Sequence, residues 1–385
     1  MPASPVELHS KLPNVGTTIF TVMSALAAKH GAINLSQGFP DFDCDPDLAS
    51  LVAAHMAQGR NQYAPMTGVG TLREAIATKY QELYGARYDP DTEVTITSGG
   101  TEALFDAITA LVRSGDEVIL FEPCYDSYVP AVELAGGTPV FVSLRYPGYR
   151  VDWDEVGRAV TSRTRLILIN TPHNPTGTAL LAEDVQALRK LLAHTSSLVL
   201  SDEVYEHIIF DGLAHESMAR YPDLASRSLI VGSFGKMFHT TGWKVGYLVA
   251  PASLSAEIRK VHQFVTFATH TPTQHALADF LRRREKYLEL PTFYQHKRDL
   301  FLQLVASSRF TPIACRGSYF QLLDYSAITN EVDRDFAIRL TVDHGVASIP
   351  TSSFLYKQAA PPVLRFCFAK KEETLRKAAE RLCAL

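Results

Sequence analysis

Short apolar runs alternate with longer amphipathic stretches from Val94 to Ser233, and this rhythm constrains the fold more than any other feature. Six of the runs predict strands, at Val94–Thr97, Glu117–Phe121, Thr138–Val142, Leu166–Ile169, Leu198–Ser201 and Leu229–Ser233. The stretches between them predict helices, among them Glu102–Arg113, Ser127–Leu134 and Ala182–Ala193. Apolar, β-branched strands separated by helices are typical of a mostly parallel sheet covered on both faces. Ligands of such sheets bind beyond the carboxyl ends of the strands, so we look for chemistry there.

The rest of the chain follows other patterns. Polar, Pro- and Ser-rich residues up to Gly16 predict an arm, and Glu257–Leu281 predicts a long helix that connects two lobes. From about Pro291, mixed segments predict a smaller α+β lobe, with strands near Phe310–Ile313, Tyr319–Leu323 and Val363–Phe368 and helices at Asp333–His344 and Glu372–Leu382. We therefore expect a large domain over 45–285 and a small one over 286–385, with residues 1–44 forming an arm and part of the small domain.

Composition excludes several classes of function. The 385 residues carry a formal net charge of −4, so no basic excess points to a nucleic-acid or anionic-membrane partner. No window approaches eighteen uninterrupted apolar residues, and the first residues lack the apolar core of a signal peptide. The five cysteines are widely spaced and include no C-x-x-C pair. We expect a cytoplasmic protein with free thiols, no disulfide framework and no metal site.

Several common fingerprints fail. Gly68–Arg73 begins like a dinucleotide-binding loop but lacks the third glycine and follows no apolar strand. Gly235-Lys236 lacks the glycine that a Walker A loop requires, and the chain contains neither H-E-x-x-H nor G-x-S-x-G. Nicotinamide, ATP, zinc-protease and serine-hydrolase chemistry are therefore not favoured.

The strand that ends at Ser233 is followed by Lys236, which lies between small and aromatic residues. A lysine desolvated in this way can lose its proton and react as an amine with a carbonyl. Ser233 and Lys244 offer a hydroxyl and a cation, which together suit an anion such as a phosphate monoester. From this stretch alone, a solvated loop lysine is an equally good interpretation.

Three other strand ends carry polar groups. Asp202 directly follows a buried strand and needs a cationic or hydrogen-bonding partner, which a protonated pyridinium nitrogen would supply; an aspartate that caps a turn is the plain alternative. Asn174 lies in a turn fixed by Pro175 and Gly177, or in an ordinary loop. Where a strand meets a helix, Ser98–Glu102 could expose backbone N–H groups to a phosphate, or merely cap the helix.

These motifs together, in their order and spacing, resemble the fold-type I pyridoxal-phosphate aminotransferases of class I/II. The motifs are Gly99–Thr101, Asn174–Gly177, Asp202–Tyr205, Ser233–Lys236 and Lys244, and the similarity extends from Leu35–Asp41 to Arg365–Lys370. Within the class, the chain most resembles the bacterial methionine aminotransferases and the kynurenine/glutamine aminotransferases. The resemblance implies an α/β large domain with a mostly parallel seven-stranded sheet flanked by helices, plus a smaller α+β domain.

The resemblance also implies pyridoxal 5′-phosphate as cofactor and a role for each matched residue. Lys236 would bind the cofactor covalently and then move the substrate's proton, while Asp202 would pair with the pyridinium nitrogen. Asn174 and Tyr205 would donate to the cofactor's 3′ oxygen, and Tyr125 would stack on the pyridine ring. The phosphate would be held by Gly100, Thr101, Ser233 and Lys244.

Further matches concern the substrate and a partner subunit. Arg365 would bind the substrate α-carboxylate through two parallel bonds, helped by the Gly38 N–H and by Asn174. We expect Arg365 to be half-buried, because Leu364 and Phe366 flank it in a strand. Tyr63 matches a tyrosine that reaches the phosphate of a second subunit, which implies an obligate homodimer with shared active sites.

Substrate choice follows from what lines the pocket. His262–Asp279 contains no arginine for a second carboxylate, and Phe20, Phe39, Phe267 and His270 are candidate pocket walls. We therefore expect an aminotransferase (EC 2.6.1 type) that moves the amino group of methionine or an aromatic or kynurenine-like amino acid, rather than aspartate, to a 2-oxo acid. The alternative is a lyase with the same cofactor that cleaves the C–S bond of cysteine conjugates or cystathionine. A third class, a pyridoxal-phosphate-sensing regulator, needs a DNA-binding domain for which the short arm leaves no room.

Overall fold

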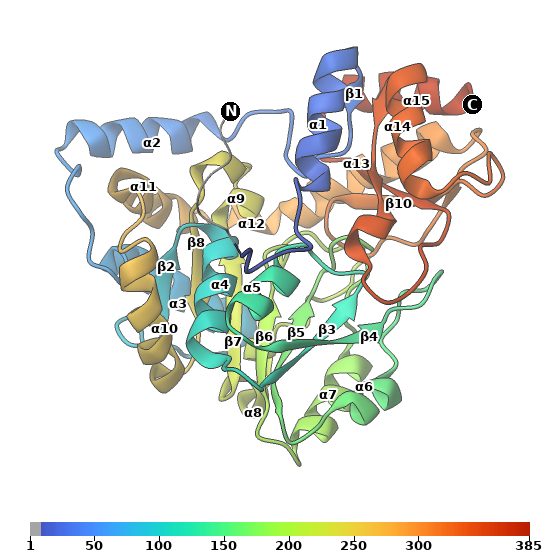
Figure 1. Ribbon diagram of the computed structural model, residues 1–385. Helices are drawn as coiled ribbons and strands as arrows, with labels where there is room; N and C mark the ends of the chain where they lie inside the picture. Colours follow the sequence, from blue (N-terminus) through green and yellow to red (C-terminus); the bar gives the residue numbers. More distant parts are fainter. Residues whose placement is uncertain (1–8) are drawn as a thin grey trace, which may run out of the picture.

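A seven-stranded sheet lies at the centre of the computed structural model, which describes residues 9–385 (Figure 1). Its strands are β2 (Val94–Thr97), β3 (Glu117–Glu122), β4 (Thr138–Ser143), β5 (Thr164–Asn170), β6 (Leu198–Asp202), β7 (Ser228–Ser233) and β8 (Gly246–Val249). They are ordered β2-β8-β7-β6-β5-β3-β4, and within this sheet β8 alone runs antiparallel to its neighbours. The predicted mostly parallel sheet is therefore confirmed.

All six strands expected from the apolar runs form, within about two residues of the predicted ends, and β8 is the one that pattern reading missed. Strand β8 is four residues long, and only the short α9 (Phe234–Met237) and a single 3₁₀ turn separate it from β7, so no long amphipathic helix marks it as a separate strand. It pairs with β2 on one side and with β7 on the other, and thereby joins β2, at the edge of the sheet, to the parallel strands.

Helices cover both faces of the sheet, because alternate residues of each strand point to opposite sides. Helices α4 (Gly99–Leu111), α5 (Tyr128–Leu134) and α10 (Ala252–Val265) enclose one apolar cluster with strand residues such as Leu120 and Leu200. The opposite face packs under α3 (Gly70–Tyr84), α6 (Trp153–Ala159) and α7 (Ala182–Leu192). The short helices α8 (Pro222–Ala225) and α9 (Phe234–Met237) flank β7.

The long connecting helix predicted over Glu257–Leu281 is wrong. The chain instead forms α10 and a separate α11 (Thr271–Leu281), broken where Phe267 adopts a left-handed backbone with φ 68°. Pro272 in the first turn of α11 cannot continue the preceding helix, since it lacks the N–H that such a helix needs. Helix α10 packs against α4, and α11 packs against α3 and α2 (Pro46–Ala57), so neither helix bridges to the second sheet.

The C-terminal part builds a second, four-stranded antiparallel sheet in the order β12-β13-β10-β9. Its strands are β9 (Thr311–Pro312), β10 (Phe320–Asp324), β12 (Ile349–Pro350) and β13 (Val363–Cys367), and its helices are α13 (Leu290–Val305), α14 (Asp333–Asp343) and α15 (Glu372–Cys383). The short α12 (Glu285–Leu288) precedes α13. The strands and helices expected in this region form close to their predicted bounds.

The first helix and strand of the chain lie beside these C-terminal elements (Figure 1). Strand β1 (Ile33–Asn34) pairs in parallel with β11 (Val346–Ala347), and α1 (Ile19–His30) packs against α14. Residues 9–18 of the predicted arm form neither helix nor strand, and residues 1–8 of that arm lie outside the described part of the chain. Across residues 9–385, the structure contains no helix of the length and apolarity needed to cross a bilayer.

A buried ion pair joins the sheet to α3. Lys79 donates to the Glu206 carboxylate and, at 2.7 Å, to Tyr247 Oη, while Tyr84 Oη donates to the other Glu206 oxygen at 2.6 Å. Both charged side chains are almost completely buried, at 2% exposure for Lys79 and 4% for Glu206. This network fixes the segment that follows β6, and with it the neighbouring Tyr205.

We predict that Lys79→Met lowers the free energy of unfolding by about 3–5 kcal/mol, because it leaves the Glu206 carboxylate buried without its cation. Urea unfolding followed by circular dichroism measures the change. The control is Lys377→Met, which breaks the exposed Lys377–Glu373 pair and should leave the midpoint where it is. A Lys79→Met protein with the wild-type midpoint would show that Lys79 does not stabilise the fold.

Candidate active site

A cavity of about 1080 Å³ opens at the carboxyl ends of β5, β6 and β7, whose last residues Asn170, Asp202 and Ser233 all line it. Most of the residues singled out from the sequence line the same cavity. They are Phe20, Gly38, Phe39, Gly100, Thr101, Tyr125, Asn174, Asp202, Tyr205, Ser233, Lys236, Lys244 and Arg365. The structure thus brings together groups that are up to 345 positions apart, from Phe20 to Arg365.

Lys236 lies in α9, directly after β7, and its amine is hydrogen-bonded to residues from the N-terminal and C-terminal parts of the chain. Its Nζ donates to Tyr319 Oη at 2.6 Å and to the Gly38 carbonyl oxygen at 3.3 Å, and Tyr319 in turn donates to that carbonyl at 2.6 Å. Burial lowers the pKa of Lys236 to about 8, with Arg365 and Lys244 contributing in the same direction. Near pH 8 about half of the amines are uncharged and can act as nucleophiles.

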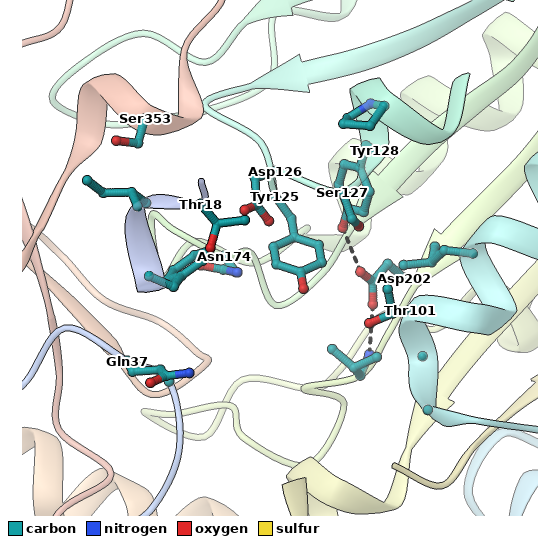
Figure 2. A pocket seen from close by; sticks show the side chains of 18 of the residues that line it. Thr18, Gln37, Thr101, Tyr125, Asp126, Ser127, Tyr128, Asn174, Asp202 and Ser353 are labelled. Carbon is teal, nitrogen blue, oxygen red and sulfur yellow. Dashed lines mark hydrogen bonds between the residues drawn. The ribbon is translucent and has the colours of Figure 1, made fainter. Parts of the chain in front are cut away.

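Asp202 ends β6 and has no cationic partner among residues 9–385. Its Oδ2 accepts from Tyr128 Oη at 2.6 Å and its Oδ1 from the Val204 N–H at 3.3 Å (Figure 2). Burial outweighs these bonds and raises the pKa of Asp202 to about 6. A cation placed in the cavity beside this carboxylate would stabilise its charged form, so the site suits a protonated nitrogen of a ligand.

The turn that follows β5 is tied to Asp202 by one amide. Asn170 Nδ2 donates to the Asp202 carbonyl at 2.9 Å, and Asn170 Oδ1 accepts from the Asn174 N–H at 2.7 Å. In Figure 2, the Tyr125 ring projects into the cavity between Asn174 and Asp202. Burial raises the pKa of Tyr125 to about 12 and that of Tyr205 still further, so both phenols keep their protons and can donate.

The first turn of α4 is suited to an anion, and we call it the anion site. No side chain caps this helix, so the backbone N–H groups of Gly100 and Thr101 are available at its positive end. Gly99 has φ 76°, which favours glycine, and a Cβ there would lie 3.3 Å from Lys244 Nζ. The ammonium of Lys244 therefore lies against this turn, and the Ser233 hydroxyl lines the cavity with it.

Arg365 in β13 is completely buried, so the expectation of a half-buried side chain is wrong. Strand β13 lies between β12 and β10, and the guanidinium carbon stacks 3.9 Å from the centroid of the Phe320 ring. Nη1 donates to Asn174 Oδ1 at 2.7 Å and Nη2 to the Ser36 carbonyl at 2.9 Å, while Nε has no partner among the described residues. Burial lowers the pKa of Arg365 to about 10, which leaves it charged at neutral pH.

Arg365 and its neighbours present donors that would suit a carboxylate. The bond from Arg365 engages the Asn174 oxygen, so the amide nitrogen of Asn174 remains as a donor. Gly38 also lines the cavity, and a Cβ at this position would lie only 2.6 Å from the Phe320 ring, so the backbone approaches closely. A guanidinium with a free Nε beside such donors fits a carboxylate bound by more than one hydrogen bond.

Three predicted residues do not line this cavity. Tyr63 is 86% exposed and stacks edge-on against Phe267, with ring centroids 5.6 Å apart. Phe267 is 43% exposed, and His270 precedes α11, where its Nδ1 lies 2.7 Å from Thr273 Oγ1. Any contact of these residues with a second subunit's cavity remains a prediction.

Sequence reasoning missed several residues that line the cavity or contact Lys236. Part of the arm, from Asn14 to Thr18, forms one wall, although its composition suggests no role. Others lie near a chosen residue or within a predicted element, which is a signal in the sequence: Asp126 and Tyr128 near Tyr125, Tyr319 at the start of a predicted strand, and Arg334 in a predicted helix. Ser353 and Tyr356, before β13, lie in neither and have no such signal.

Comparison with known proteins gives consistent results. A family model for aminotransferases of class I and II matches residues 30–382. The chain is 54% identical to a methionine aminotransferase of Escherichia coli over 99% of both chains, and 36% identical to human kynurenine–oxoglutarate transaminase 1 over 93% of both. A crystal structure of an E. coli protein with a methionine aminotransferase function superposes with a TM-score of 0.97 at 54% identity, covering 99% of this chain and 100% of the other.

We predict that Lys236 reacts with acetic anhydride with a midpoint near pH 8, whereas exposed lysines titrate near about 10.4. Competitive labelling of the cofactor-free protein across pH 6–11, read by peptide mass spectrometry, measures both in one sample. Tyr319→Phe removes an oxygen that accepts from the ammonium, so it should move the Lys236 midpoint to lower pH. A Lys236 midpoint above pH 10 would contradict the assignment of this lysine as the nucleophile.

Proposed function

The protein belongs to the class I and II aminotransferases and is itself an aminotransferase, and from this premise we propose that it moves the amino group of methionine, or of an aromatic or kynurenine-like amino acid, to a 2-oxo acid. The observation that carries the proposal is the joint placement of a nucleophilic lysine and a buried arginine in one cavity. The names of two relatives, a methionine aminotransferase and a kynurenine–oxoglutarate transaminase, support the substrate class.

The residues present fit pyridoxal 5′-phosphate as cofactor. Asp202 lacks a cation, which a protonated pyridine nitrogen provides, and the uncapped turn of α4 with Lys244 suits a phosphate. When bound, pyridoxal phosphate supplies an aldehyde that reacts with amines and a ring that accepts electrons from the substrate's Cα. The set proposed to hold it is Tyr63 of a second subunit, Gly100, Thr101, Tyr125, Asn174, Asp202, Tyr205, Ser233, Lys236 and Lys244.

Each of these residues has a definite task in the proposal. Asp202 would keep the pyridine nitrogen protonated, Asn174 and Tyr205 would donate to the 3′ oxygen, and Tyr125 would stack on the pyridine ring. Tyr128 orients the Asp202 carboxylate by donating a 2.6 Å hydrogen bond to its Oδ2.

Substrate binding and proton transfer belong to the other side of the cavity. Arg365 binds the α-carboxylate, together with the N–H of Gly38 and the amide of Asn174, and thereby orients the Cα–H bond. Lys236, with a pKa near 8, would take the proton from Cα as a general base and then, as an acid, give it to the C4′ carbon of the cofactor. The centroid of the Phe20 ring lies 5.2 Å from the Arg365 guanidinium carbon, and this ring helps to exclude water from the substrate's carboxylate.

We also propose a homodimer. Several large apolar side chains are exposed near Tyr63: Phe264 is 86% exposed, Val265 50% and Phe267 43%. Burying this patch, formed by Tyr63, Phe264, Val265 and Phe267, against a second copy would remove it from water and bring Tyr63 towards the other subunit. The five cysteines are all unpaired, which supports a reducing compartment such as the cytoplasm.

The proposed domain division follows the sheets. Residues 45–285 would form the large domain that holds the cofactor, and 286–385 the small domain. Residues 1–44 would add an arm and, through β1 beside β11, a part of the small domain.

We predict that L-methionine, added to the holoenzyme without any oxo acid, abolishes the yellow absorption band of the bound cofactor. One equivalent of the 2-oxo acid of methionine should form per active site, without release of ammonia. The amino group stays on the enzyme, so a later addition of oxo acid should restore the band. L-aspartate is the comparison donor and should act much more slowly, and a panel of oxo acids then ranks the acceptors. A persistent band with release of ammonia and thiol would identify a C–S lyase instead, and a protein that takes up no pyridoxal phosphate would overturn the role of Lys236.

We predict that Phe264→Arg separates the subunits, since it places a charge in the apolar patch, and that the monomer loses activity although Lys236 is untouched. Tyr63→Phe should remain dimeric but bind the cofactor more weakly, because it lacks the phenolic donor. Analytical ultracentrifugation and activity are measured on the same samples. A wild-type protein that sediments as a monomer and is fully active would rule out shared sites.

A further inference from the structure

A buried cluster of three ionisable side chains joins α10 to α4 beneath the anion site. His262 of α10 and Asp106 of α4 are completely buried, and Glu102 of α4 is 8% exposed. His262 Nδ1 lies 2.9 Å from Glu102 Oε1 and 3.4 Å from Asp106 Oδ2. His262 Nε2 lies 2.9 Å from the carbonyl oxygen of Met66.

The partners of His262 determine its protonation state. A neutral imidazole has a single N–H, whereas here both ring nitrogens face oxygens that accept hydrogen bonds, a carboxylate on one side and a backbone carbonyl on the other. His262 satisfies both partners when it carries two protons and a positive charge. Burial lowers the pKa of His262, but the neighbouring carboxylates of Asp106 and Glu102 outweigh it and raise the pKa to about 9.

Each partner of His262 belongs to a segment that the proposed cofactor site needs. The second oxygen of Glu102 accepts from the Ser98 N–H, directly before the Gly100 and Thr101 donors of the anion site. Met66 lies three residues after Tyr63, in the loop between α2 and α3. One imidazolium thus connects the start of α4 with the segment that carries Tyr63.

We propose that His262 is a positioning residue for the phosphate end of the cofactor: as an imidazolium it clamps the start of α4 to the Met66 loop, so that cofactor affinity depends on its charge. The inference rests on the proposed cofactor and adds a residue that touches neither cofactor nor substrate. It acts through Glu102 and the backbone of Met66.

The direction of the pH effect follows from the contacts. When His262 loses a proton it can donate to one partner only, so either the Met66 loop is released or the buried Glu102 charge loses its partner. The loss of the positive charge also weakens the attraction for a phosphate at the anion site. The released contact and the lost charge therefore both lower the affinity for the cofactor. The clamp is complete well below pH 9 and is lost as the pH rises through 9.

The other groups packed around His262 do not replace it. Strand β2 faces α10 with uncharged Thr95 and Thr97. Arg259, one turn earlier on α10, is engaged by Thr95 Oγ1 and the carbonyls of Asp91 and Val94. The charges that face the imidazole are therefore those of Glu102 and Asp106, and neither oxygen of Asp106 has a regular hydrogen bond.

The test compares the affinity of the cofactor-free full-length protein for pyridoxine 5′-phosphate between pH 7 and pH 10.5. This probe carries the phosphate but no aldehyde, so Lys236 cannot form a covalent bond with it. The measured quantity is the ratio of Kd for His262→Gln to Kd for wild type, in which the titration of the probe itself cancels. We expect a ratio of about ten at pH 7 that falls towards one above pH 10.

Two further variants keep the experiment decisive. Asp106→Asn keeps the shape of the cluster but removes a negative charge beside the imidazole, which lowers the pKa of His262. The affinity of this variant for the probe should therefore fall at a lower pH than the affinity of wild type does. His296→Gln changes an exposed histidine and should give a ratio of one throughout. Should His262→Gln fail to fold, the shift in Asp106→Asn tests the same charge.

Three results would overturn the clamp. A ratio of one at pH 7, or a ratio that does not change with pH, would leave His262 with no role or a merely structural one. If EDTA lowered the affinity of wild type for the probe as much as His262→Gln does, the cluster would hold a metal ion in place of the second proton. Failure of wild type to bind the probe at any pH would instead contradict the proposed cofactor.

Discussion

The parallel pairing of β5, β6 and β7 is the constraint on which the rest of the structure depends. The three strands end at one edge of the sheet, with Asn170 opposite Asp202 and Asp202 opposite Val231. Asn170 joins two of these ends by bonding both to the Asp202 backbone and to Asn174. Because the spacing of neighbouring strands is fixed by hydrogen bonds, a carboxylate at the end of β6, an amide in the turn after β5 and the lysine after β7 all face one volume.

This dependence explains how much of the site can be predicted from sequence. Lys236, Asp202 and Asn174 each follow a continuous apolar run, and the register of a parallel sheet places residues after such runs at the same edge. The glycines at the start of α4 are equally local, since a strand, a glycine pair and a helix follow one another directly. The positions of these residues can therefore be predicted from the local sequence pattern and from the rule that parallel strands end at the same edge of a sheet.

What could not be predicted depends on contacts between distant segments. The full burial of Arg365 results from β12 and β10 on either side and from the Phe320 ring, none of which a flanking pair of apolar residues reveals. The break at Phe267 depends on a single left-handed residue, and the wall built by Asn14–Thr18 has no compositional signal. His262 belongs to the same group, because its partners Glu102 and Met66 lie about 160 and 196 positions away.

The contact of Arg365 with Ser36 has a consequence for synthesis on the ribosome. The arginine is almost the last strand residue of the chain, yet it bonds to a carbonyl near the beginning, 329 positions earlier. A nascent chain that has completed the seven-stranded sheet already contains Lys236 and Asp202 but not the proposed carboxylate site. Until the final strand is released and inserted beside β10, such a chain contains the lysine proposed as the nucleophile but lacks the arginine proposed to bind the substrate's carboxylate.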